Sequence, residues 1–132
     1  MIQSFKVKTN SRSDFIDITS QVQNVLSSSR INSGICQVYI PHTTAGVTIN
    51  ENADPNVKSD IIQSLEKTIP WHENYRHIEG NSAAHIKASM MGFSASIPVE
   101  NGNLVLGTWQ CIYFCEFDGP RTRNVIVTMI GS

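Results

Sequence analysis

Four histidines are the side chains of this 132-residue chain best suited to hold a metal ion or carry a proton: His42, His72, His77 and His85. Imidazole titrates near neutral pH and is the commonest metal ligand in proteins. No pair has the four-residue helical spacing of a His-Glu-x-x-His zinc site. His77 and His85 are eight positions apart, while His42 lies far away along the chain. Only the fold can therefore bring them into one site, and each histidine alone is also an ordinary surface or core residue.

Oxygen-bearing side chains stand beside two predicted strand ends. Thr43 and Thr44 come directly after His42, and Asn50 and Glu51 follow the next run of β-branched residues. Hydroxyl and amide groups can bind phosphate or sugar oxygens, although turns use the same residue types. Glu51 adjoins apolar residues, which makes it a candidate general base or metal partner if it is buried.

Two arginines and a tryptophan complete the candidate groups. Arg121 and Arg123 follow an Asp-Gly-Pro turn, where they could clamp a phosphate or, alternatively, protect an exposed sheet edge with charge. Trp109 lies in an apolar stretch and is as well suited to a core as to a binding site. The chain lacks the glycine-rich motifs for ATP, dinucleotides and serine hydrolases, so those activities are not expected.

The elements that must position these residues are short. Predicted strands cover residues 4–9, 15–18, 35–40, 46–50, 94–99, 104–117 and 124–130, and predicted helices cover 20–26, 55–69 and 82–91. Asp54 followed by Pro55 is a helix start, and Gly92 is a helix end. Gly107 predicts a bulge or bend near the start of the 104–117 strand.

The order ββαββααβββ is typical of the α+β class, with a curled, mixed or largely antiparallel sheet and helices on one face. The length fits a single domain spanning residues 1–132. It excludes a (β/α)₈ barrel, which needs roughly 250 residues.

Composition limits the classes of partner and the cellular location that we expect. Ten Lys plus Arg against eleven Asp plus Glu give a net charge of −1, so we expect no nucleic-acid partner. No run of apolar residues is long enough to cross a membrane, and no signal peptide is evident at Met1. Cys36, Cys111 and Cys115 lie in apolar strands without a Cys-x-x-Cys pair, which predicts reduced, buried thiols and a cytoplasmic protein.

Six strings, in order along nearly the whole chain, resemble the YjbQ family, formerly called UPF0047. They are His42-Thr43-Thr44-Ala45, 50–55, 79–85, Ile97-Pro98-Val99, 106–110 and 118–123. The resemblance implies one α+β domain that forms a homotrimer, with a polar, histidine-containing site near the subunit contacts. It also implies a thiamine-phosphate synthase activity that is described as secondary.

The resemblance also implies roles for particular residues. The histidines of the family correspond to His42, His77 and His85, which would hold the metal or donate hydrogen bonds to phosphate, whereas His72 lies outside the shared strings. The catalytic residues would be Glu51, His42 and Arg121, and the substrate-binding residues would be Thr43, Thr44, Asn50, Asn81, Trp109 and Arg121.

The implied reaction joins hydroxymethylpyrimidine pyrophosphate to a thiazole phosphate and releases pyrophosphate. Charge builds up on the leaving group, so Arg121 and a divalent metal would stabilise it. Mg²⁺ prefers oxygen ligands, whereas a histidine cluster favours Zn²⁺, so the identity of the metal stays open. The histidine site could bind zinc for a different reaction, or bind an anion with no metal at all. Two alternatives remain: a zinc-type hydrolase of a small phosphorylated metabolite, and a non-catalytic trimeric protein that binds a metabolite or metal. A charged fraction of only 16% is compatible with self-association.

Overall fold

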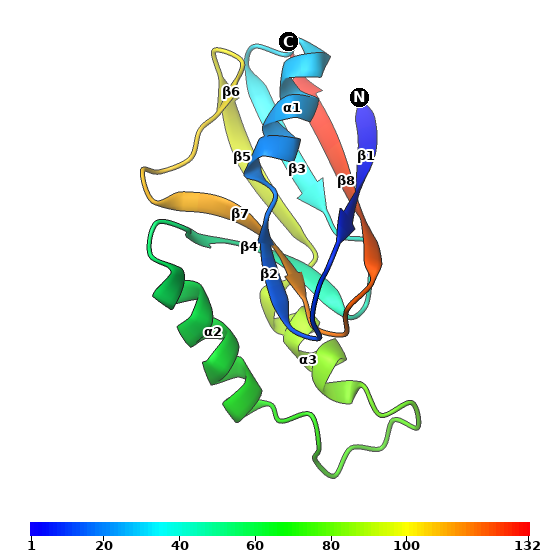
Figure 1. Ribbon diagram of the computed structural model, residues 1–132. Coiled ribbons are helices and arrows are strands. Elements are labelled where there is room, and N and C mark those ends of the chain that lie inside the picture. The colour runs from blue at the N-terminus through cyan, green and yellow to red at the C-terminus, as the bar shows by residue number, and fades with distance from the viewer.

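Two antiparallel sheets form the frame of the protein (Figure 1). The computed structural model describes residues 1–132. The strands are β1 (Ile2–Lys8), β2 (Asp14–Asp17), β3 (Gly34–Tyr39), β4 (Ala45–Glu51), β5 (Ser94–Glu100), β6 (Asn103–Leu104), β7 (Gln110–Glu116) and β8 (Thr122–Gly131). The helices are α1 (Thr19–Ser29), α2 (Pro55–Thr68) and α3 (Ser82–Met91). The large sheet has the order β1-β8-β3-β5-β6 and the small sheet the order β2-β7-β4.

The predicted α+β class and antiparallel pairing are confirmed. The predicted 104–117 strand is instead two strands, β6 in the large sheet and β7 in the small one. The break falls at Gly107, whose amide donates to Oε1 of Gln110 over 2.8 Å, while the Gln110 amide donates back to the Gly107 carbonyl. This turn carries the chain from one sheet to the other, which a strand-propensity pattern does not register.

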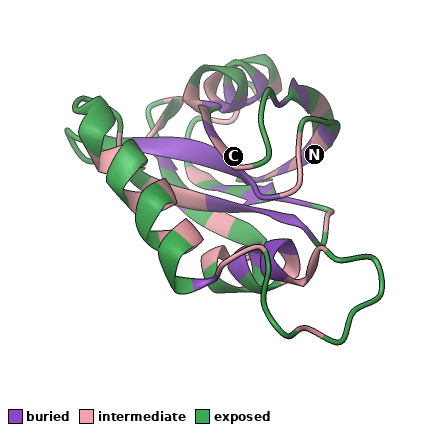
Figure 2. Cartoon of the chain, turned by 60° about the horizontal axis from the view of Figure 1, so that its bottom comes forward, coloured by how far each residue is buried: buried purple, intermediate pink, exposed green.

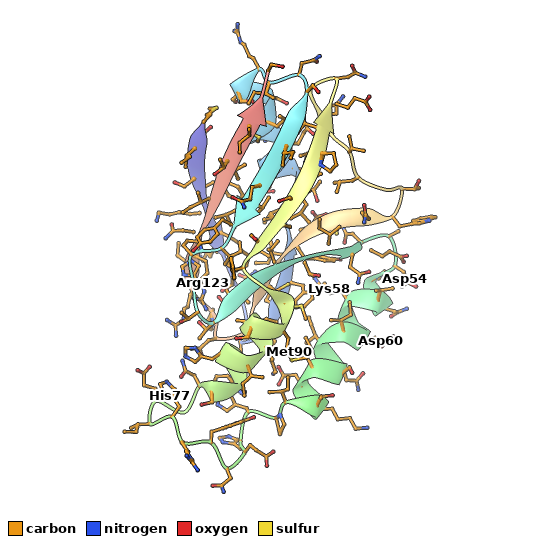
Figure 3. The ribbon with its side chains drawn as sticks, turned by 180° about the vertical axis from the view of Figure 1, so that it is seen from behind. Asp54, Lys58, Asp60, His77, Met90 and Arg123 are labelled. Carbon is orange, nitrogen blue, oxygen red and sulfur yellow. The ribbon has the colours of Figure 1, made fainter.

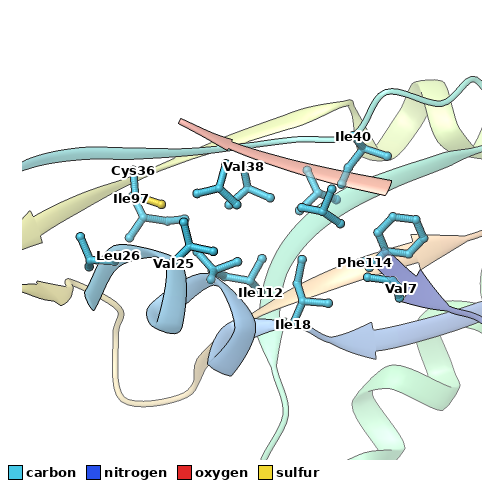
Figure 4. Packing of buried hydrophobic residues seen from close by; sticks show 14 of the residues in the cluster. Val7, Ile18, Val25, Leu26, Cys36, Val38, Ile40, Ile97, Ile112 and Phe114 are labelled. Carbon is cyan, nitrogen blue, oxygen red and sulfur yellow. The ribbon is translucent and has the colours of Figure 1, made fainter. Parts of the chain in front are cut away.

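Two hydrophobic clusters divide the molecule into layers. The first cluster fills the space between the large sheet, α1 and the inner face of the small sheet, and it includes Ile112 and Phe114 of β7, with Phe114 beside Val7 of β1 (Figure 4). The second lies between the outer face of the small sheet and the helices α2 and α3. The small sheet is therefore covered on both faces, which explains the continuous apolar run of β7.

The helices lie in different layers, in contrast to the expectation that all of them gather on one face. Helix α1 packs with the large sheet, and α3 packs against β4 and β7 of the small sheet. Helix α2 begins as predicted, because the Asp54 side chain accepts from the Asn56 amide over 2.9 Å. No residue of α2 is buried, and its outer surface is open in Figure 2. None of the helices is long and apolar enough to cross a membrane.

The second face of the large sheet has no helix over it (Figure 3). Residues alternate along its strands, so that Cys36 and Val38 are buried while Ile35 before them and Tyr39 after them are exposed. Ile130 of β8 is 67% exposed on the neighbouring strand. An apolar surface of this kind is typical of a surface that contacts another protein chain.

Helix α3 approaches β4 most closely at Gly46. A Cβ atom at this position would lie 2.6 Å from the Gly92 carbonyl oxygen and 3.2 Å from the Met91 Cβ. The next residue, Val47, donates its amide to the same Gly92 carbonyl over 3.1 Å. Only glycine therefore allows α3 to reach the sheet at this contact.

We expect Gly46→Ala to destabilise the protein by about 1–3 kcal/mol, because the added methyl group forces backbone atoms apart. Gly107→Ala is the matched control, because its Cβ would meet only the flexible Gln110 side chain at 3.3 Å. The measurement is the free energy of unfolding in urea. Equal stability of the two variants would contradict the close contact between β4 and α3.

Candidate functional site

A polar cavity of about 760 Å³ opens where β3 ends, β8 begins and the 77–85 segment leads into α3. We call it the histidine cavity, because His42, His77 and His85 all line it. Arg121 and Arg123 from the start of β8 line it as well, and Figure 3 shows His77 and Arg123 on the same side of the molecule. The fold thus brings together side chains that are far apart in the sequence.

A buried ion pair lies at the inner end of this cavity. Glu116 of β7 is fully buried and Arg123 of β8 is 4% exposed. Oε1 of Glu116 accepts from Nε of Arg123 over 2.8 Å, and Oε2 accepts from Nη2. Burial alone would raise the pKa of Glu116, but the hydrogen bonds from Arg123, the Asp118 amide and Thr9 outweigh it and hold the pKa below its usual value.

The ion pair also fixes the loops around the cavity. Nη2 of Arg123 donates to Oγ1 of Thr44 over 2.8 Å, which ties down the loop between β3 and β4. Thr9 donates to Glu116 and accepts the amide of Arg121, both over 2.8 Å. These contacts connect three separate segments of the chain through one pair of charges.

Asp118 links the turn before β8 to the start of α3. Its Oδ2 accepts from Nη2 of Arg121 over 2.8 Å and from Nδ2 of Asn81 over 3.0 Å. The other amide atom of Asn81, Oδ1, is buried without any hydrogen-bond partner. Asn81 lines the histidine cavity, but its Oδ1 has no accessible surface, so a ligand in the cavity does not reach this atom.

The three histidines differ in how they are held. Nε2 of His42 accepts the backbone amide of Asn124 over 2.9 Å. Burial and the charge of Arg123 lower the pKa of His42, which keeps the ring neutral. The rings of His77 and His85 are neighbours, with centroids 5.3 Å apart and planes at 84°.

This arrangement does not fit a metal site made of all three histidines. A histidine binds a metal through a ring lone pair, and the Asn124 amide already occupies the one at Nε2 of His42. No group of three or more His, Cys, Asp or Glu side chains within the chain is arranged to hold a metal ion. A metal-binding role for His42, His77 and His85 stays a prediction, and His42 is its weakest member.

Three of the predicted site residues lie elsewhere in the chain. Asn50 and Glu51 are at the far end of β4, about 20 Å from the end that adjoins the cavity. Trp109 is 64% exposed and lines a different pocket of about 400 Å³ beside Asn52. Thr43, Thr44, Asn81 and Arg121 line the histidine cavity, and their roles in binding a substrate stay predictions.

Sequence reasoning missed Glu116, and it offered Arg123 only as a phosphate clamp or as a charge that protects a sheet edge. A signal for Glu116 is present, because it is the only charged residue in the apolar run of β7. A carboxylate in such a run needs a buried cation as its partner. The nearest arginines in the sequence, Arg121 and Arg123, follow directly after the turn at residues 118–120.

The fold and cavity define an α+β protein whose candidate site is lined by arginine and histidine. Comparison with known sequences identifies the family: the model for "UPF0047 protein YjbQ-like" matches residues 3–132. The UPF0047 protein YugU of Bacillus subtilis is 54% identical over 132 residues, covering 99% of this chain and 100% of YugU. YjbQ of Escherichia coli O157:H7 is 37% identical over 119 residues, covering 86% of each chain. The chain therefore belongs to the YjbQ/UPF0047 family.

Solved structures agree with this assignment. An uncharacterised YjbQ/UPF0047 protein of Clostridium acetobutylicum has a TM-score of 0.95 and 54% identity, covering 97% of this chain and 99% of that one. A hypothetical protein of Aeropyrum pernix K1 has a TM-score of 0.96 and 39% identity, and the match covers 100% of this chain and 99% of that one. The fold is thus kept among relatives whose sequences differ at more than half of their positions.

We expect Glu116→Gln to destabilise the protein by about 3–5 kcal/mol at pH 7, because it leaves Arg123 buried without a counter-charge. The matched control is Glu100→Gln, because Glu100 is exposed and forms no ion pair. Glu116 has a lowered pKa, so its contribution is present above its unfolded pKa of about 4.3 and is lost as the pH falls through the folded value. Unfolding in urea from pH 7 to pH 2 should show the gap between wild type and Glu116→Gln closing in acid. A gap that stays constant with pH would contradict this assignment.

Proposed function

We propose that the histidine cavity binds a small phosphorylated metabolite, and that the protein has thiamine-phosphate synthase-like activity as a secondary reaction. Hydroxymethylpyrimidine pyrophosphate would be joined to a thiazole phosphate, with release of pyrophosphate. The observation that carries the proposal is the convergence of Arg121, Arg123 and three histidines on one cavity. N–H donors of this kind are suited to phosphate oxygens.

The side chains of the cavity have distinct roles in this reaction. Departure of pyrophosphate builds negative charge, which Arg121 and Arg123 stabilise by charge-assisted hydrogen bonds. Thr43 and Thr44 orient phosphate oxygens with their hydroxyl groups. Asn81 donates its Nδ2 to Asp118, which in turn accepts from Arg121, so Asn81 positions that arginine at the cavity.

A homotrimer would explain why Asn50, Glu51 and Trp109 lie away from the cavity in one chain. We propose that the far end of β4 in one copy meets the histidine cavity of the next, where Glu51 would accept a proton and Trp109 would contact an aromatic ring. A head-to-tail contact of this kind closes into a ring. The exposed apolar face of the large sheet supports a contact between copies.

Two other functions compete with the synthase. The neighbouring rings of His77 and His85 favour a zinc-type hydrolase of a phosphorylated metabolite, in which His42 need not bind the metal. A trimer that binds a metabolite or metal without catalysis is the third candidate. Metal analysis of purified protein separates them, because about one zinc per chain favours the hydrolase. The proposed location is the cytoplasm, where buried thiols such as Cys36, Cys111 and Cys115 stay reduced.

We expect His85→Ala to lower synthase turnover about 10²-fold or more, because it removes a group that lines the cavity. His72→Ala is the control, because His72 is exposed and does not line the histidine cavity. The measurement is pyrophosphate release with both substrates present. Full activity in His85→Ala would contradict the proposal, and wild-type turnover far below ~1 s⁻¹ would mark the synthase as a side reaction.

We expect the wild-type protein to have the mass of a trimer in solution. Ile130→Asp should reduce that mass, because it places a charge on the open apolar face of the large sheet. Lys67→Asp, at an exposed position on α2, is the control. Light scattering after size-exclusion chromatography gives the masses. A monomeric wild-type protein would contradict the trimer.

A further inference from the structure

We infer that His42 is a fixed N–H donor, and that it forms with Arg123 an oxyanion subsite for a phosphate or pyrophosphate group. This subsite rests on the proposed function, because it specifies how the histidine cavity would hold its phosphorylated ligand. It assigns His42 a role different from metal binding and from proton acceptance.

The first step is the position of the proton on His42. A backbone amide can only donate, so Nε2 of His42 must carry a lone pair where it meets the Asn124 amide at 2.9 Å. The proton of the neutral ring is then on Nδ1. Nδ1 makes no hydrogen bond within the chain, and His42 lines the histidine cavity. The ring therefore presents a donor to a ligand.

The register of the sheet explains why this tautomer is held. β3 pairs with β8 as far as Tyr39 opposite Ile126. Two residues further in the same register, Pro41 would stand opposite Asn124, but the chain has already turned toward β4. The Asn124 amide loses its partner in the ladder, and the imidazole of His42 replaces it. A buried or half-buried amide needs such an acceptor, so the ring orientation follows from the backbone.

The second step is the free end of Arg123. Its Nε binds Glu116, and its Nη2 binds Glu116 and Thr44. Nη1 makes no hydrogen bond within the chain, although the residue is only 4% exposed and lines the histidine cavity. A guanidinium that is held on two nitrogens keeps the third in a fixed direction, which favours an oxyanion.

Free N–H donors in the cavity, and not its net charge, favour the same ligand class, because Arg121 is paired with Asp118 and Arg123 with Glu116. Arg121 and Arg123 line it together with one carboxylate, that of Glu79. Glu116 is already surrounded by donors from Arg123, Thr9 and the backbone. Glu116 therefore has little remaining capacity to bind a cation, and Arg121, whose Nε and Nη2 bind Asp118, keeps Nη1 for a second phosphate oxygen.

The position of the proton on the His42 ring also determines whether the ring can bind an anion or a metal ion. To bind a metal through Nε2, His42 would have to leave the Asn124 amide. To bind through Nδ1, it would need its proton on Nε2, facing an N–H. Either change leaves the Asn124 amide without its acceptor, at a cost of about 1–3 kcal/mol for a buried donor.

Nitrogen NMR of the ¹⁵N-labelled wild-type protein tests the tautomer directly. We expect His42 to show a protonated Nδ1 and an unprotonated Nε2, and Nδ1 to shift when inorganic pyrophosphate is added. The Nε–H signal of Arg123 should shift in the same titration. Added Zn²⁺ should leave both nitrogens of His42 unchanged. A proton on Nε2, or a response of His42 to Zn²⁺, would overturn the inference.

Binding of inorganic pyrophosphate by calorimetry supplies the second test. His42→Ala should weaken pyrophosphate binding roughly 10- to 100-fold, the usual effect of losing a hydrogen bond to a charged group. The control His72→Ala should bind as wild type, and Zn²⁺ binding should be the same in His42→Ala and wild type. Unchanged pyrophosphate affinity, or lost Zn²⁺ affinity, in His42→Ala would overturn the subsite.

Pyrophosphate binding and synthase turnover, measured on the same variants, distinguish failure of this subsite from failure of the proposed function. Pyrophosphate binding that depends on His42 in a protein without synthase turnover would support the subsite and remove the reaction. Synthase turnover, together with a pyrophosphate affinity that is the same in His42→Ala and in wild type, would support the reaction and overturn the subsite.

Discussion

The buried pair of Glu116 and Arg123 is the interaction on which the candidate site depends. Two charges removed from water are costly, and they are tolerated only when nearly all of their donors and acceptors are bound. Here the partners come from four segments: Thr9 after β1, Thr44 before β4, the amides after β7, and Arg123 itself on β8. Satisfying the pair therefore fixes the loops that surround the histidine cavity. The pair links the small sheet to the large one, since β7 and β8 belong to different sheets.

The cavity itself arises where the large sheet stops pairing. β3 leaves β8 after Tyr39, and the space beyond is occupied by His42 on one side and by the turn with Arg121 on the other. Helix α3 closes the space with His85, and it can do so because Gly46 lets the helix approach β4. Nη1 of Arg123 and Nδ1 of His42 are both unbound within the chain, and both side chains line this space, which is the physical origin of the anion subsite that we infer.

Local sequence signals predict much of the fold, and their failures have physical causes. The start of α2 at Pro55 follows from the Asp54 cap, and the end of α3 at Met91 follows from Gly92, because capping residues act over a few positions. The 104–117 stretch was expected to be one strand because propensity does not reveal where a chain changes sheets. The convergence of His42 with His85 was implied only by family resemblance, since no spacing encodes it. The tautomer of His42 depends on the register between β3 and β8, and the separation of Trp109 from the histidines depends on the direction of β4. Neither property is local.

A crystal structure of the protein grown with inorganic pyrophosphate tests the central claim most directly. We expect pyrophosphate oxygens about 2.7–2.9 Å from Nη1 of Arg123 and from Nδ1 of His42, the length of charge-assisted hydrogen bonds. Nε2 of His42 should still accept the Asn124 amide, and Glu116 should keep its contacts to Arg123. Pyrophosphate bound away from these two nitrogens would contradict the account. So would a metal about 2.0–2.1 Å from His42 with the Asn124 hydrogen bond broken.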